Sequence, residues 1–204
     1  TTNGQSYVTC VYSGENKVFN DPFDWTATGY SREHTYCHSW MPTYPCDNPE
    51  QPEYTDQHNL YPTNLANANS YRSNLPLMDI TGNTLFTYLE GSVGYNGNQM
   101  CYQATCYNLQ NNLNWGIAAN QDQATLKTWH FADLPDSYEI ARQEYIFSVQ
   151  GNRNPYIDSV NFVCHVDFDN MSYLATSCNV GIEEQLAANL SVFPVPSNGN
   201  VYAQ

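Results

Sequence analysis

The chain has 204 residues, 41% of them hydrophobic, and carries 20 acidic against 6 basic residues, for a formal net charge of −14. This length fits one domain with a short tail and can bury a sizeable hydrophobic core. The charge excludes a protein that grips nucleic acid through a basic surface alone, because that mode needs cations to displace counterions. The sequence contains no run of about 18 apolar residues and therefore predicts no membrane-spanning segment.

The cysteine and lysine content predicts a secreted protein. Seven cysteines are many for a cytosolic chain and usual for an oxidising compartment, whereas Lys17 and Lys127 are the only lysines. The chain begins at Thr1 without a signal-type segment, which we interpret as a mature or trimmed secreted product. The odd cysteine count predicts up to three disulfides and one remaining thiol. Cys37 and Cys46 are the favoured pair, because the loop between them is short and rich in proline.

Strands and loops are expected in three parts of the chain. Residues 7–12 alternate and are rich in β-forming side chains, which indicates a strand. The prolines of residues 41–56 exclude a helix interior and indicate a loop. Residues 80–100 contain several glycines and predict a strand and hairpin, and residues 157–168 alternate weakly and predict a closing strand.

Two short helices are expected before residue 110. The first covers residues 63–72, and its spacing places four side chains on one face: Leu65, Ala68, Asn69 and Arg72. The second covers Met100 to Tyr107. Cys101 and Cys106 would lie about 140° apart around its axis, so they are not expected to pair with each other.

Two longer helices have clear boundary signals. Asn120 followed by Gln123 resembles a capping box, with Leu126 and Trp129 as the apolar stripe. Asp136 followed by Glu139 repeats the capping signal, and Gly151 is the expected end of that helix. The second helix is expected to bury the face formed by Tyr138, Ala141, Tyr145 and Val149.

Residue types that can perform chemistry gather between residues 32 and 74. Glu33, His34 and Asn69 supply a carboxylate, an imidazole and an amide, a set that suits a hard divalent cation and a general base. Neighbouring side chains on a regular strand point to opposite faces, so Glu33 and His34 can serve one site only if the backbone bends there. Asn69 and Arg72 lie one helical turn apart and can share a site.

Structural roles compete with these readings. His38 and His58 are interpreted as hydrogen-bonded structural residues rather than ligands, as are His130 and His165, which lie outside the cluster. No CxxC pair is present, so a structural zinc site is not expected. The tyrosines fit either a sugar-binding platform or ordinary β positions.

Three ordered blocks resemble the bacterial endonuclease I family, which are secreted or periplasmic nucleases with a His-Me finger, or ββα-metal, motif. The first is Tyr30–Pro42 (YSREHTYCHSWMP), and the second is Asp56–Pro62 (DQHNLYP) followed by Asn69–Asn74 (NSYRSN). The third runs from Tyr145 to Asp158 and ends in QGNRNPYID (Gln150–Asp158). The resemblance covers roughly residues 7–168.

The resemblance implies an α+β fold with a ββα-metal core and additional short strands and helices. It also implies roles for the matching residues. Glu33 and Asn69 would be the metal ligands, His34 the general base, and Arg32 and Arg72 substrate contacts, with holding Asn69 as the other role of Arg72. The implied cofactor is Mg²⁺ or another divalent cation such as Mn²⁺ or Ca²⁺.

The chain departs from the family pattern before Met100, where family members carry an acidic and basic stretch that is absent here. The family's N-terminal helix is also absent. Near Val180 the composition changes, which predicts a nuclease domain at residues 1–179 and a linker with a truncated module at 180–204. Ser191–Asn200 resembles the opening of the C-terminal sorting domain used in type IX secretion.

The resemblance thus implies a secreted, monomeric, metal-dependent endonuclease that cleaves DNA, and RNA as a second substrate, with little sequence specificity and no membrane partner. Two alternatives stay open at this point. One is a nuclease that has lost its activity together with the missing basic stretch. The other is a noncatalytic extracellular module that binds glycan or protein, which the tyrosine content and the acidity favour.

Overall fold

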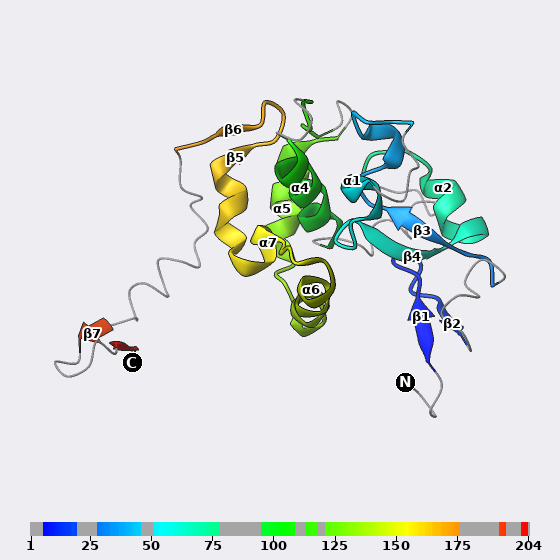
Figure 1. The fold of residues 1–204 in the computed structure, drawn as a ribbon, viewed down its shortest axis with the longest axis horizontal. Coiled ribbons are helices and arrows are strands. Elements are labelled where there is room, and N and C mark those ends of the chain that lie inside the picture. The colour runs from blue at the N-terminus through cyan, green and yellow to red at the C-terminus, as the bar shows by residue number, and fades with distance from the viewer. Residues whose placement is uncertain are drawn as a thin grey trace.

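The fold is α+β, as the sequence predicted, with short strands and with most of the helices in the second half of the chain (Figure 1). The computed structural model describes residues 6–19, 28–45, 51–77, 95–108, 113–117, 121–175, 192–194 and 201–203. None of the helices among these residues is long and apolar enough to cross a membrane.

Among the described residues, each odd-numbered strand forms an antiparallel pair with the strand that follows it in the chain. They are β1 (Tyr7–Thr9), β2 (Asn16–Val18), β3 (Tyr30–His34), β4 (Leu60–Asn64), β5 (Val166–Asp167), β6 (Ser172–Tyr173), β7 (Val192–Pro194) and β8 (Val201–Ala203). The strand predicted at residues 7–12 is shorter than expected, because the chain turns after Cys10 and Gly14 donates a backbone hydrogen bond back to that residue. The predicted boundary at residue 180 stays a prediction.

The helices are α1 (Pro52–Thr55), α2 (Ser70–Arg72), α4 (Tyr95–Tyr107), α5 (Gln123–Ala132), α6 (Ser137–Gln150) and α7 (Pro155–Asp158). Two 3₁₀ segments, η1 (His38–Trp40) and η5 (Val160–His165), and one π-helical segment, η2 (Leu65–Asn69), complete the described elements. Of the hairpin predicted at residues 80–100, residues 95–100 are helical, which corrects that part, and residues 80–94 lie outside the described residues.

A ββα unit holds the residues of the first two sequence blocks. Strand β3 pairs with β4, with Glu33 opposite Tyr61 and His34 opposite Leu60. The helical segment η2–α2 follows β4 directly, and η2 packs against both strands (Figure 1). The short Ala68 side chain is buried in this contact, together with Tyr30 of β3.

The helix predicted at residues 63–72 starts later than expected. Thr63 and Asn64 still belong to β4, and the Asn64 side chain caps η2 by accepting hydrogen bonds from the backbone N–H groups of Ala66 and Asn67. The first turns are π-helical, which changes the spacing of side chains around the axis. As a result Leu65 is 48% exposed rather than part of the buried face.

The main hydrophobic core lies among the helices of the second half. Helix α4 packs against α5 and α7, and α5 packs against η5 (Figure 1). Trp115, Leu126, Tyr156 and Phe168 are buried at the centre of this core, and Trp129 joins it, so the apolar stripe predicted for α5 is confirmed. The cap predicted at Asn120 is wrong, because the chain enters the helix two residues later and the side chain of Asp122 accepts the first backbone hydrogen bonds.

Helix α6 has the predicted ends but not the predicted buried face. Asp136 and Glu139 form a capping box, and Gly151 ends the helix with a positive φ of 78°. The expected face is solvent-exposed: Tyr138 is 61%, Tyr145 is 70% and Val149 is 64% exposed.

The buried face of α6 is instead largely polar. Its Gln143 side chain donates to Asp158 and accepts from the backbone N–H of Asn154, so both the nitrogen and the oxygen of the buried amide have a partner. The strand predicted at residues 157–168 is wrong, because the chain after α6 forms two short helical segments. Asn154 caps helix α7, whose first residue is Pro155, and the chain continues into η5 before the two-residue strand β5.

Candidate active site

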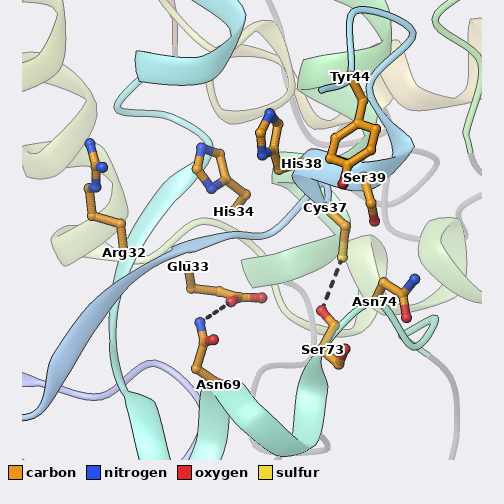
Figure 2. Close-up of a pocket in the computed structure, with 10 residues that line it drawn as sticks. All are labelled: Arg32, Glu33, His34, Cys37, His38, Ser39, Tyr44, Asn69, Ser73 and Asn74. Carbon is orange, nitrogen blue, oxygen red and sulfur yellow. Dashed lines mark hydrogen bonds between the residues drawn. The ribbon is translucent and has the colours of Figure 1, made fainter. Parts of the chain in front are cut away.

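Strand β3 carries three candidate residues into one pocket. Arg32 and His34 leave the strand on one side and Glu33 leaves it on the other, as the strand alternation requires (Figure 2). The strand ends at His34 and the chain bends at the next two residues, so side chains from both sides line the same cavity of about 390 Å³. The lining residues are Arg32, Glu33, His34, Cys37, His38, Ser39, Tyr44, Asn69, Ser73 and Asn74.

Glu33 and Asn69 are in direct contact. The Asn69 side chain donates from Nδ2 to Oε2 of Glu33 at 2.7 Å, and the Tyr12 hydroxyl donates to Oε1 at 2.5 Å (Figure 2 shows the first contact). Glu33 is only 4% exposed. Burial raises the pKa of its carboxyl to about 7, although the charge of Arg72 and the Tyr12 hydrogen bond act in the opposite direction.

The His34 ring is fixed by Tyr54. Its Nε2 lies 2.8 Å from the backbone carbonyl oxygen of Tyr54, and the two rings stack with centroids 4.9 Å apart. A carbonyl oxygen can only accept, so Nε2 carries the hydrogen and Nδ1 is the ring atom that can take up a proton. Burial lowers the pKa of His34 to about 4, which keeps the imidazole neutral near pH 7.

Arg72 lies beneath the pocket rather than in it. Its side chain has no exposed surface and donates to Sγ of Cys37 at 2.7 Å and to the carbonyl oxygens of Ser73 and Thr35. Its guanidinium also stacks on Trp40 at 5.1 Å. In this arrangement the guanidinium joins α2 to the end of β3, which favours the role of holding the segment that carries Asn69 over contact with a phosphate.

The predicted Cys37–Cys46 disulfide is wrong, because Cys37 is a free thiol that faces the Arg72 guanidinium. Burial raises the pKa of this thiol to about 11. Cys10, Cys101 and Cys106 are also free thiols, and Cys101 and Cys106 do not pair with each other, as predicted. The prediction of up to three disulfides and one remaining thiol is wrong, because four of the seven cysteines are free and the other three can form at most one intrachain disulfide.

The remaining predicted residues divide between the pocket and the interior. Arg32 is exposed at the pocket and its guanidinium lies 5.7 Å from the Tyr54 ring. His38, interpreted as structural from the sequence, also lines the pocket and stacks on His34. His58 and His130 are buried and bond to backbone carbonyls, as expected of structural histidines.

Sequence reasoning missed Tyr12 and Tyr54. Tyr12 follows β1 and was interpreted only as a strand residue, since nothing in the sequence signals that its hydroxyl reaches a carboxylate 21 residues later. Tyr54 acts on His34 through its backbone carbonyl, which leaves no signature in the residue type.

The donor set fits a hard cation with few protein ligands. One carboxylate and one amide face each other, and rotating the Asn69 amide by half a turn would bring Oδ1 to the carboxylate, so that two oxygens meet as Mg²⁺ or Ca²⁺ prefers. Across the described residues, no group of three or more His, Cys, Asp or Glu side chains can hold a metal ion. Ligands beyond Glu33 and Asn69 would therefore come from water or substrate.

Comparison with known proteins agrees with the third sequence block. The sequence model of the Endonuclease I family matches residues 98–161, which include α5, α6 and the QGNRNPYID segment. No curated protein matches the chain. The match supports the endonuclease I family for this segment and suggests a nuclease. Glu33, His34 and Asn69 lie before the matched segment, in the ββα unit.

Proposed function

We propose that the protein is a secreted, divalent-metal-dependent endonuclease that hydrolyses phosphodiester bonds of DNA, and of RNA as a second substrate, with little sequence specificity. The observation that carries this proposal is the 2.7 Å contact between Asn69 and Glu33 in a pocket that also contains His34. The family match at residues 98–161 supports the same reaction class independently, because it rests on a different part of the chain.

Glu33 and Asn69 would hold the divalent cation, of which Mg²⁺, Mn²⁺ and Ca²⁺ are the candidates. When bound, such a cation neutralises charge on the phosphate and on the leaving oxygen. Tyr12 orients the Glu33 carboxylate through its hydroxyl, and Arg72 holds α2 against the end of β3. These contacts hold Glu33 and Asn69 in place and leave the solvent-facing side of the pocket free.

His34 would remove a proton from the attacking water at Nδ1. The Tyr54 carbonyl keeps the hydrogen on Nε2 and holds the ring plane, so the acceptor atom is defined before substrate arrives. The lowered pKa of His34 means that the ring is not already protonated at neutral pH. Arg32, exposed at the same pocket, is the candidate contact for a phosphate of the substrate.

The test is nicking of supercoiled plasmid in Mg²⁺ or Mn²⁺. His34→Ala should lower nicking by about 10²- to 10⁴-fold, the usual contribution of a general base, while calorimetric titration shows metal binding largely retained. His165→Ala removes a histidine outside the pocket and should nick like the wild type. Equal nicking by His34→Ala and wild type would reject the mechanism. A folded wild type that does not nick in either cation would favour the inactive-nuclease alternative.

A further inference from the structure

The chain has almost no cationic surface with which to bind a phosphate backbone. All six basic residues lie in the described part of the chain: Lys17, Arg32, Arg72, Lys127, Arg142 and Arg153. Arg72 has no exposed surface, Arg142 donates to carbonyls of the segment entering β4, and Arg153 pairs with two carboxylates. Lys127 donates to a backbone carbonyl of β5. Arg32 is the one basic side chain that lines the pocket.

Aromatic side chains, rather than cationic ones, form much of the lining of this pocket. His38 stacks on His34 with centroids 5.7 Å apart and packs against Tyr54 at 4.8 Å. Tyr44 meets the edge of His38 at 5.2 Å, with the ring planes 73° apart. Tyr44 is 54% exposed although it lines the cavity, so much of its ring is available to solvent. Figure 2 shows Tyr44 and Arg32 at opposite ends of the lining, with His34 between them.

We propose that Tyr44, supported by His38, is a stacking subsite for an unpaired nucleobase, and that the enzyme therefore prefers single-stranded nucleic acid. This inference rests on the proposed nuclease function. Stacking on an exposed ring binds any base, because every base has a π-face, and it needs no positive charge. In a duplex the bases are already stacked on each other, so a ring at the pocket rim has no base to receive.

The same geometry predicts an unusual response to salt. Each phosphate held by a protein cation contributes a slope of about −0.7 to the logarithmic dependence of single-strand affinity on salt concentration. With Arg32 as the only basic residue in the pocket, that slope should be no steeper than about −0.7. The net charge of −14 makes it flatter still, because salt screens the repulsion between the body and the strand.

The experiment compares cleavage of a 12-nucleotide single strand with cleavage of the same sequence as a duplex, in Mg²⁺, by the full chain. Tyr44→Ala should lower kcat/KM for the single strand by about 5- to 100-fold, the effect of losing one stacked base. Cleavage of the duplex should change less than about twofold, since no base reaches the ring. Tyr44→Phe keeps the ring and should retain both activities. Tyr145→Ala removes another exposed tyrosine, on α6, and is the matched control.

The possible results distinguish failure of the proposed stacking subsite from failure of the proposed nuclease function. If the wild type cleaves and Tyr44→Ala behaves like Tyr145→Ala on the single strand, the stacking subsite is rejected and the nuclease stands. If the wild type cleaves neither substrate, the proposed function fails, and fluorescence anisotropy with a labelled 12-mer in EDTA decides the subsite alone. In that assay, unchanged affinity in Tyr44→Ala, or a salt slope much steeper than about −0.7, overturns it.

Discussion

Gln150, the last residue of α6, donates a hydrogen bond from Nε2 to Oδ1 of Asp56 at 2.7 Å, across 94 positions of the chain. Asp56 lies in the segment that leads into β4 and is 3% exposed. The hydroxyls of Tyr102 and Tyr107 on α4 donate to its other oxygen at 2.6 and 2.7 Å. One buried carboxylate therefore joins the segment matched by the family model to the ββα unit that carries the candidate site.

Replacing Asp56 by alanine should destabilise the whole domain. The change leaves the buried hydroxyls of Tyr102 and Tyr107 and the buried backbone N–H of His58 without their acceptor. Each unpaired buried donor costs about 1–3 kcal/mol. The expected loss is about 3–5 kcal/mol in the free energy of unfolding, measured by urea denaturation.

Asp133→Ala is the control for this measurement, because Asp133 is exposed and only its backbone N–H makes a hydrogen bond, to Trp129. Its effect should stay within about 0.5 kcal/mol. A loss below about 1 kcal/mol in Asp56→Ala would show that the network does not couple α4 and α6 to the ββα unit.

Arg72→Lys separates the two roles expected for this residue. Lysine keeps the charge but cannot reproduce the forked contacts to Cys37, Thr35 and Ser73. If Arg72 holds α2 against β3, the free energy of unfolding should fall by about 2–4 kcal/mol and metal affinity should fall with it. If it contacts phosphate instead, Arg72→Lys should retain both stability and metal affinity and change only KM. Thermal unfolding and calorimetric titration of the metal distinguish these outcomes.

His130 should make the fold sensitive to acid. The ring is fully buried, and burial lowers its pKa below the ordinary value of 6.5. The unfolded state therefore binds a proton first as pH falls below about 6.5, so stability is lost with acidification through that range and is unaffected above it. His130→Gln keeps a donor for the Val160 carbonyl but cannot titrate. Its melting temperature should fall less than that of the wild type between pH 7.5 and 5.5, and an equal or larger fall would contradict the prediction.

The sequence predicted the parts of the fold that depend on local signals. The capping box of Asp136 and Glu139 and the stop at Gly151 are correct because each is satisfied within a few residues. The buried face of α6 was wrong because hydrophobicity alone suggested Tyr145, whereas the side chains that find partners in the segment after the helix are polar ones such as Gln143.

The candidate site, too, could be predicted only in part from the sequence. The meeting of Glu33 with Asn69 was expected from the family resemblance. The helix-face argument expected Asn69 and Arg72 to share a site, whereas Asn69 lines the pocket and Arg72 is buried beneath it. The contacts that orient the candidate residues could not be predicted. Tyr12 lies in the turn between β1 and β2, and Tyr54 acts through a backbone carbonyl, which every residue type has. Both contacts therefore depend on the tertiary fold alone.

Glu33→Gln should abolish metal binding and raise the stability of the metal-free protein. Burial raises the pKa of this carboxyl from 4.5 to about 7, so the folded state disfavours its ionised form. The resulting cost is absent below pH 4.5, grows between 4.5 and 7, and is complete above 7, where it amounts to about 3 kcal/mol. The glutamine side chain has a similar shape without the charge. In EDTA at pH 8 the variant should therefore melt roughly 5–10 °C above the wild type.

Divalent cation should reverse that order. Ca²⁺ or Mg²⁺ bound to the folded state raises the melting temperature of the wild type with increasing concentration, whereas Glu33→Gln lacks the carboxylate ligand and should not respond. Plasmid nicking should be lost in the same variant even though it is the more stable protein in EDTA. A variant that melts below the wild type in EDTA would mean that Glu33 is an ordinary structural carboxylate, whose bonds to Tyr12 and Asn69 outweigh the cost of its burial. The burial of this charge would then give no reason to place a cation beside it.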